Sequence, residues 1–130
     1  MFKGAYTALV TPFINNEVDH DALTTLVERQ ISEGIDGIVA CGSTGEAFFL
    51  SPKEQASILK TVKKAIDGRV PLIAGTSALK TSDTLGLIKN AEDIGVDGLM
   101  IVTPPYVKPT QAALYDYFKT IHDALSLIHI

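Results

Sequence analysis

The feature that most constrains the fold is a regular alternation of short apolar runs with longer amphipathic segments. Four apolar runs of strand length occupy residues 5–10, 37–41, 71–74 and 98–102. Four segments with helical patterning follow them, at 21–32, about 52–66, 81–94 and from 109 onward. Continuous apolar strands separated by helices are typical of parallel strands covered by helices. The sequence therefore predicts an α/β fold in the order βαβαβαβα.

The second predicted helix has the clearest start signal. Ser51-Pro52-Lys53-Glu54 has the form of a capping box with proline at the first helical position. Helical spacing predicts which side chains face the core. The inward residues expected in three of the helices are Leu23, Leu26, Val27 and Ile31; Ile58, Leu59, Val62 and Ile66; and Leu114, Tyr117, Phe118 and Ile121.

A weak internal repeat supports equivalent βα units. Gly34-Ile35-Asp36-Gly37-Ile38 resembles Gly95-Val96-Asp97-Gly98-Leu99, and both stretches lead from a helix end into a strand. Two architectures fit four such units: an open doubly wound sheet, or half of a (βα)8 barrel. In both of them the functional residues lie in the loops that follow the carboxyl ends of the strands.

Composition excludes several classes of function. The 130 residues make one domain or part of one, and their net charge is −4 with both signs interleaved, so no nucleic-acid surface is expected. No apolar stretch reaches the roughly 18 residues of a membrane span. The single cysteine, Cys41, cannot form an internal disulfide, which favours a cytoplasmic protein, and we expect it to fill buried space. The three histidines lack metal-ligand spacing, so no metal is expected.

The loop after the second apolar run carries the most chemistry. Gly42-Ser43-Thr44-Gly45-Glu46 is not a P-loop, a nucleophile elbow or a dinucleotide-binding fingerprint, because the required lysine and glycine spacings are absent. Glycines and hydroxyl groups suit an anion cradle for a small carboxylate. A tight turn whose hydroxyls satisfy backbone groups fits the same residues. Glu46 is interpreted as stabilising the turn.

Three motifs together resemble one known family. The loop at 42–46, Thr11-Pro12 after the first run and Thr103-Pro104-Pro105-Tyr106 after the fourth are similar to the dihydrodipicolinate synthase / N-acetylneuraminate lyase family, over residues 1 to about 125. The resemblance implies a (βα)8 TIM barrel, with residues 1–125 as its N-terminal half. It also implies a lyase that holds pyruvate as a Schiff base on a lysine, without a cofactor, and assembles as a dimer of dimers.

Within the family, the sequence is closer to the synthases, which condense pyruvate with aspartate semialdehyde in lysine biosynthesis. Ser43 departs from the threonine usual in synthases, and Gly-Ser-Thr-Gly-Glu-Ala-Phe also matches the lyases, so N-acetylneuraminate lyase or another pyruvate-dependent aldolase is the alternative. The resemblance assigns Thr44 to the pyruvate carboxylate, Ser43 and Tyr106 to a proton relay, and Gly42 and Gly45 to the shape of the turn. Tyr106 is expected to reach a neighbouring subunit's site.

One expected group is missing from the strands. No predicted strand core contains a lysine, and Lys80 and Lys108 lie on loops. The family's Schiff-base lysine and its second catalytic tyrosine come from later strands, which would fall beyond residue 130. We therefore expect residues 1–130 to be inactive alone, and a non-catalytic, carboxylate-binding half barrel is the alternative of another class. Residues 126–130 do not read like the family's fifth strand and are predicted to be a non-native tail.

Overall fold

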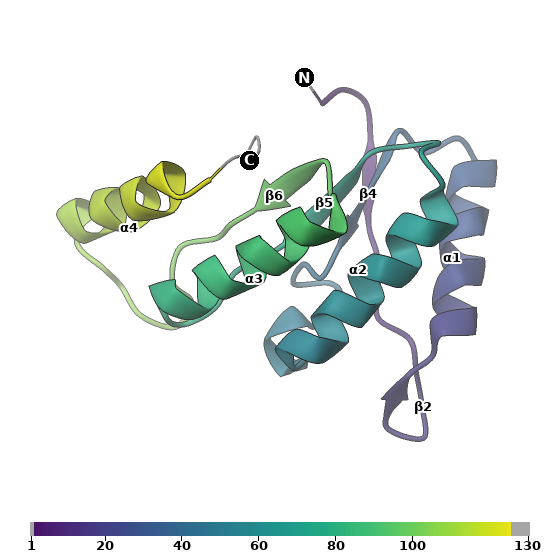
Figure 1. The fold of residues 1–130 in the computed structure, drawn as a ribbon, viewed down its shortest axis with the longest axis horizontal. Helices are drawn as coiled ribbons and strands as arrows, with labels where there is room; N and C mark the ends of the chain where they lie inside the picture. The colour runs from purple at the N-terminus through teal and green to yellow at the C-terminus, as the bar shows by residue number, and fades with distance from the viewer. Residues whose placement is uncertain (1, 126–130) are drawn as a thin grey trace.

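The computed structural model describes residues 2–125 and confirms the alternating order of strands and helices (Figure 1). The strands are β1 (Tyr6–Ala8), β2 (Phe13–Ile14), β3 (Glu17–Val18), β4 (Gly37–Ala40), β5 (Leu72–Gly75) and β6 (Gly98–Met100). The helices are α1 (His20–Ser32), α2 (Pro52–Ile66), α3 (Thr81–Ile94) and α4 (Gln111–Asp123), with a 3-10 turn η1 (Ala47–Phe49). The tail predicted at 126–130 lies outside the described residues.

Strand order decides between the two architectures that the sequence left open. Four parallel strands form one sheet in the order β1-β4-β5-β6, which is the order in which they occur along the chain. Consecutive helices pack against each other, α1 on α2, α2 on α3 and α3 on α4. A doubly wound sheet reverses its strand order and places helices on both faces. An unreversed order with one continuous helix layer is the arrangement of a barrel segment.

The core lies between the sheet and the helix layer. All four residues of β4 and all four of β5 are buried. In α2 the four predicted inward residues are buried, and in α1 Leu23 and Val27 are buried. In α4 the prediction holds for Tyr117 and Ile121 but not for Phe118, which is 38% exposed. α4 packs against α3 at the edge of the helix layer, and part of its apolar face remains exposed.

Side-chain caps fix the helix starts. The capping box at α2 is confirmed, since the Ser51 hydroxyl accepts from the Glu54 N–H while the Glu54 carboxylate accepts from the Ser51 N–H. At α1 the Asp19 carboxylate accepts from the Ala22 N–H at 2.9 Å, so this helix begins at His20, one residue earlier than predicted. A side-chain oxygen in this position satisfies an N–H group that has no partner within the helix.

The internal repeat has a structural cause. Asp36 and Asp97 each precede a strand, and each makes two bonds to the start of the neighbouring strand. The Asp36 carboxylate accepts from the Ala5 N–H at 2.8 Å, and its own N–H donates to the Ala5 carbonyl at 3.1 Å. Asp97 does the same with Leu72, at 2.9 and 2.8 Å. The repeated Gly-x-Asp-Gly therefore ties together adjacent strands at the amino end of the sheet.

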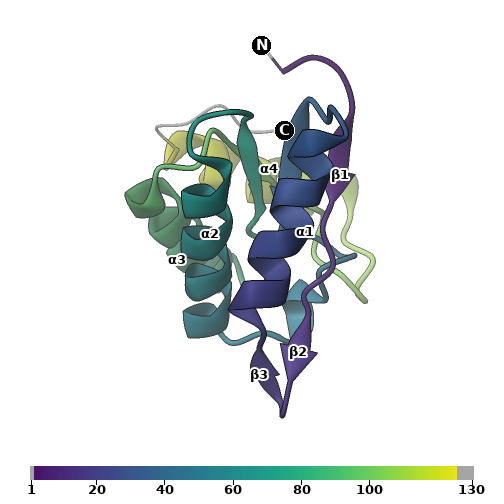
Figure 2. The same cartoon turned by 90° about the vertical axis from the view of Figure 1, so that its right-hand side faces the viewer.

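A short hairpin was not predicted. β2 and β3 pair antiparallel just after β1, and the hairpin projects at the end opposite the N-terminus (Figures 1 and 2). Its two turn residues, Asn15 and Asn16, have φ values of 52° and 63°. Two consecutive left-handed residues are the signature of a type I′ turn, which asparagine tolerates well. The sequence did contain a signal for this hairpin, namely two consecutive asparagines between the short segments Phe13–Ile14 and Glu17–Val18.

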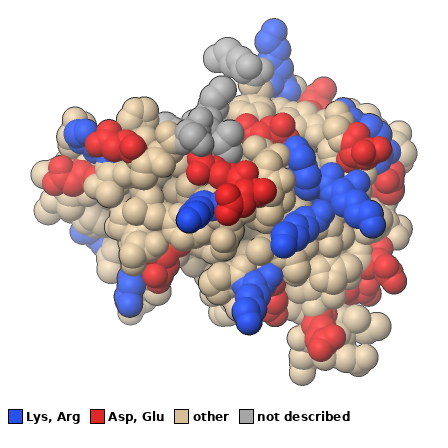
Figure 3. All heavy atoms as spheres, viewed as in Figure 1, with Lys and Arg blue, Asp and Glu red and all other residues tan. Residues whose placement is uncertain are grey.

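The surface agrees with the mixed charge seen in the sequence. On the face drawn in Figure 3, Lys and Arg side chains lie among Asp and Glu side chains over the helices. Within residues 2–125, no helix is both long and apolar enough to cross a bilayer. In the same part of the chain, no group of three or more His, Cys, Asp or Glu side chains could hold a metal ion.

Candidate active site at the carboxyl ends of the strands

The loop at 42–46 follows the carboxyl end of β4 and folds into a tight helical turn. The N–H groups of Gly45 and Glu46 donate to the carbonyls of Gly42 and Ser43, both at 3.1 Å. Within the described residues, the N–H groups and hydroxyls of Ser43 and Thr44 have no hydrogen-bond partner, and both side chains are exposed. Four donors therefore stand free on one short turn, as a carboxylate cradle requires.

Two left-handed residues bend the chain into and out of this turn. Cys41 has φ 56° although it is buried, and Glu46 has φ 56° at the start of η1. Outside glycine such backbone angles are uncommon and cluster at functional sites. Glu46 is exposed and its side chain makes no cap hydrogen bond. Its backbone, rather than its carboxylate, contributes to the turn.

Close backbone contact fixes the position of the loop. A Cβ atom placed on Gly75, at the end of β5, would lie 2.1 Å from the carbonyl oxygen of Cys41. A Cβ on Gly42 would meet the side chain of Met100 at 3.1 Å. Gly42 and Ser43 line a small hollow of about 10 Å³ together with Gly75, Ser77 and Met100. The turn thus rests directly on the ends of β5 and β6.

Tyr106 occupies the loop after β6, at the same end of the sheet. Its φ is 69° and its side chain is fully exposed. The start of this loop is anchored, since the Val102 N–H donates to the Ser77 hydroxyl at 2.9 Å. In the described part of the chain, no hydrogen bond joins Tyr106 to Ser43 or Thr44. The fold therefore brings the two loops to one edge while the tyrosine side chain points into open space.

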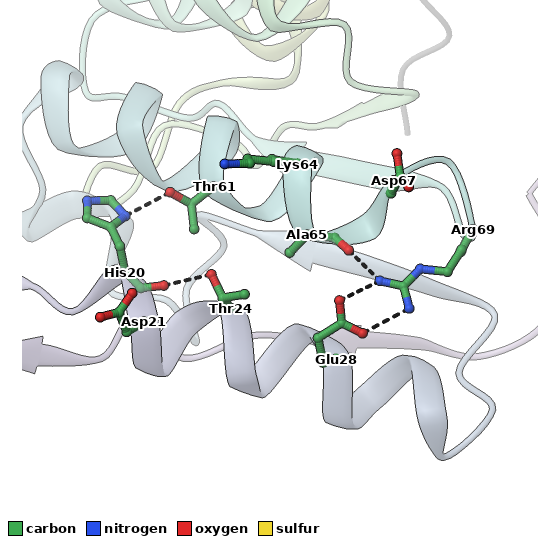
Figure 4. A pocket seen from close by; sticks show the side chains of 9 residues that line it. All are labelled: His20, Asp21, Thr24, Glu28, Thr61, Lys64, Ala65, Asp67 and Arg69. Carbon is green, nitrogen blue, oxygen red and sulfur yellow. Dashed lines mark hydrogen bonds and ion pairs between the residues drawn. The ribbon is translucent and has the colours of Figure 1, made fainter.

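A much wider groove lies elsewhere, on the outside of the helix layer, and is explained by polar contacts between neighbouring segments. It measures about 830 Å³ and runs between α1 and α2 on the outer helix layer (Figure 4). Arg69 forms a two-pronged ion pair with Glu28, at 2.6 and 2.8 Å, and Thr61 hydrogen-bonds His20 at 2.8 Å. These polar side chains pair with each other across the groove, which is a common way for two neighbouring helices to be joined.

The lysines at this end of the sheet lie outside the strands. Lys80 and Lys108 lie on loops at the carboxyl end of the sheet, and both are exposed. None of the strands within residues 2–125 contains a lysine. A Schiff-base lysine needs a desolvated position that favours the neutral amine. Lys80 and Lys108 do not occupy a desolvated position of this kind.

Cys41 is buried, as predicted. Its side chain is 3% exposed and its sulfur lies 3.9 Å from the carbonyl of Gln55. Desolvation in this position raises the pKa of the Cys41 thiol from 9.0 to about 12. The thiol is therefore protonated and shielded near neutral pH, which fits space filling and not nucleophilic attack.

This burial predicts a pH-dependent reactivity. At pH 8 we expect native Cys41 to react with a disulfide reagent on the order of 10³-fold more slowly than the unfolded chain, since its thiolate fraction falls with the raised pKa. Because the folded pKa is the higher one, stability contributed by the neutral thiol is complete below pH 9 and is lost as the pH rises toward 12. Stopped-flow thiol titration with and without urea measures the ratio, and equal rates would contradict the burial.

Comparison with known proteins places this geometry in context. The sequence matches the dihydrodipicolinate synthetase family over residues 1–130. It is 48% identical to the 4-hydroxy-tetrahydrodipicolinate synthase of Magnetococcus marinus over 121 residues, covering 93% of this chain and 41% of that protein. The synthase of Geobacter metallireducens is 46% identical over 130 residues, covering 100% of this chain and 45% of that protein. The chain thus spans less than half the length of these relatives.

Solved structures give the same answer for the fold. The chloride-inhibited dihydrodipicolinate synthase of Acinetobacter baumannii, complexed with pyruvate, superimposes with a TM-score of 0.95 at 41% identity, over 99% of this chain and 45% of that one. N-acetylneuraminate lyase of Mycoplasma synoviae superimposes with a TM-score of 0.91 at 30% identity, over 99% and 45%. The predicted fold, the N-terminal half of a (βα)8 barrel, is confirmed.

Proposed function

The chain belongs to the dihydrodipicolinate synthetase family, and from that premise we propose that it is the pyruvate-binding half of a 4-hydroxy-tetrahydrodipicolinate synthase. The complete enzyme would be a class I aldolase-type lyase that condenses pyruvate with aspartate semialdehyde in lysine biosynthesis. The observation that carries the proposal is the turn at 42–46, whose Ser43 and Thr44 donors stand free at the carboxyl edge of the sheet.

In this proposal Thr44 binds the substrate. Its hydroxyl and N–H donate to the carboxylate of pyruvate, and Gly42 and Gly45 give the turn the shape that leaves these donors free. Hydrogen bonds to a charged acceptor are roughly twice as strong as neutral ones. A small keto acid is therefore held by its carboxylate, with its carbonyl carbon directed toward the amine that attacks it.

Ser43 and Tyr106 transfer protons in the proposed reaction. The amine of a lysine supplied from beyond residue 130 adds to the keto carbon, and a proton must reach the resulting hydroxyl before water leaves to form the imine. Loss of a methyl proton then gives the enamine that attacks the aldehyde. Hydroxyl groups near the imine can carry these protons. The exposed, left-handed Tyr106 suits a side chain that acts in a neighbouring subunit's site.

The proposal includes an assembly, which the exposed side chains support. Phe49, the last residue of η1, is 88% exposed, and Val107, which directly follows Tyr106 in the chain, is 58% exposed. Exposed aromatic and aliphatic side chains of this kind are typical of protein interfaces. We propose a cytoplasmic homo-oligomer, a dimer of dimers, that works without a cofactor.

N-acetylneuraminate lyase is the second candidate. The serine at position 43 is the observation that favours it, because the turn then reads as it does in the lyases. A hydroxyl is present in either case, so the proposed relay is the same. Aspartate semialdehyde and N-acetylmannosamine offered separately with pyruvate distinguish the two activities.

The test uses protein expressed from the gene carried through to its natural stop codon. With pyruvate and borohydride, the wild type is expected to gain the mass of one pyruvic acid less one oxygen atom, the balance of imine formation and reduction. Ser43→Ala and Tyr106→Phe should each lower kcat about 100-fold, whereas Thr44→Val should chiefly raise the KM for pyruvate, by about tenfold. Thr25→Val, on the outer face of α1, is the control that should change neither. A wild type that gains no adduct would refute the proposal.

A further inference from the structure

Thr11 lies outside the loop at 42–46 but forms a buried hydrogen bond with it. It lies just after β1 and is 8% exposed. Its hydroxyl donates to the carbonyl of Gly45 at 2.7 Å, across 34 positions of the chain. Gly45 is the residue directly after Thr44, the proposed carboxylate ligand.

Gly45 is held from both sides. Its N–H donates to the Gly42 carbonyl at 3.1 Å, and its carbonyl accepts from Thr11. A Cβ atom on Gly45 would lie 3.1 Å from the Leu9 carbonyl oxygen and 3.3 Å from the Thr11 hydroxyl, so the turn presses directly on the end of β1. With both peptide groups of Gly45 fixed, the backbone of Thr44 has little freedom to turn its N–H and hydroxyl away.

We propose that Thr11 is a positioning residue for the carboxylate cradle, acting through Gly45 and not by contact with the substrate. The inference rests on the proposed function. Its physical basis is that a buried carbonyl without a hydrogen-bond donor is unfavourable, so the backbone shifts until the carbonyl has a partner. Without the Thr11 hydroxyl, the Gly45 carbonyl would turn toward water, and the turn would no longer hold the neighbouring Thr44 in one orientation.

A purely structural role for Thr11 would predict something else. In that case the hydroxyl only joins the end of β1 to the loop after β4, and its loss would lower stability without a selective effect on pyruvate. Thr7 provides the matched comparison, because it lies in β1, four residues before Thr11, and its hydroxyl donates to the side chain of Gln30 in α1 at 2.8 Å. Thr7→Val removes a similar bond that does not touch the cradle.

The test compares Thr11→Val, Thr11→Ser and Thr7→Val in the protein carried to its natural stop codon. Thr11→Val should raise the KM for pyruvate about tenfold, equivalent to about 1.4 kcal/mol, and leave kcat within about threefold of the wild type. Thr11→Ser should restore the KM, and Thr7→Val should leave it unchanged. If Thr11→Val does not fold, Thr11→Ala carries the same expectation, since it removes the hydroxyl without adding a methyl group against the carbonyl.

The outcomes separate the two proposals. Wild type that forms the borohydride-trapped adduct, with an unchanged KM in folded Thr11→Val or Thr11→Ala, would overturn the role of Thr11 alone. A raised KM that Thr11→Ser fails to restore would overturn it as well. Wild type that forms no adduct would overturn the proposed function, and the role of Thr11 with it.

Discussion

Residues 1–130 expressed alone are expected to form no pyruvate adduct in the presence of borohydride and to show no aldol activity, whereas the same chain carried to its natural stop codon shows both. The first reason is the amine. The strands of the described part of the chain contain no lysine, and Lys80 and Lys108 are exposed on loops, where nothing desolvates them. A lysine that forms a Schiff base needs a desolvated position that favours its nucleophilic form.

The second reason is cooperation within the relay. The family resemblance assigns a second tyrosine to a later strand, so Ser43 and Tyr106 would act without one partner. Catalytic groups that act as a unit fail together, and loss of one member removes most of the rate. We therefore expect kcat/KM to fall by at least about 10⁴-fold. The activity that remains would be too low for a coupled enzyme assay to detect.

The measurement needs a monodisperse sample. β1 and β6 form the two edges of the sheet within residues 2–125, and unpaired strand edges favour association between copies. The short form is therefore separated by size before intact-mass analysis and assay, with the longer form as the positive control. An adduct on the short form at the rate of the longer one, mapped to Lys80 or Lys108, would show that the later strands are not needed for the covalent step.

The sequence predicted those parts of the structure that depend on local patterns. The Ser51 capping box and the inward face of α2 follow from neighbours three or four positions apart, so they could be predicted from sequence. The loop at 42–46 could be located as well, because it follows an apolar strand. What local patterns do not contain is contact between distant segments. The bond from Thr11 to Gly45 and the approach of Gly75 to Cys41 exist only once β1, β4 and β5 are aligned.

Two other features were missed for different reasons. The Asn15–Asn16 hairpin is local, but each of its strands has only two residues, too few for an alternating pattern to be recognised. The exposed part of α4 was missed although its sequence pattern is clear. Its apolar spacing is regular, yet Phe118 remains partly exposed because spacing gives the direction of a face and not the presence of a neighbouring element to cover it.

Gly75→Ala is expected to be among the most damaging single changes in this chain. The added Cβ would lie 2.1 Å from the Cys41 carbonyl oxygen, 2.7 Å from its carbonyl carbon and 3.0 Å from the Cα of Gly42. All three are backbone atoms, so no side chain can rotate to make room. Cys41 already has a left-handed backbone, which leaves it little freedom to adjust. A loss of about 4 kcal/mol or more in the free energy of unfolding is expected for a buried clash of this kind.

Gly86→Ala is the matched control, because the same methyl group is added where it meets nothing. Gly86 lies in the interior of α3 and is exposed, and beyond its chain neighbours and the backbone of its own helix no atom lies within 4 Å of the position that an added Cβ would take. Alanine is favoured over glycine inside a helix by about 1 kcal/mol, so this variant should be more stable than the wild type. Urea unfolding followed by circular dichroism, under the same conditions for both variants, measures the free energy of unfolding. It should fall for Gly75→Ala and rise for Gly86→Ala.

Gly75→Ala should also affect pyruvate binding, because the atoms it displaces lie at the start of the turn at 42–46. Moving Cys41 and Gly42 away from β5 shifts the start of the turn that carries Ser43 and Thr44, so any Gly75→Ala protein that folds should bind pyruvate more weakly. Gly86→Ala changes a helix surface and should bind pyruvate as the wild type does. Isothermal titration with pyruvate, on the longer form, tests this separately from stability. A Gly75→Ala protein with wild-type stability and wild-type affinity would mean that the end of β5 does not approach the Cys41 carbonyl, and the contact that positions the turn would have to be sought elsewhere.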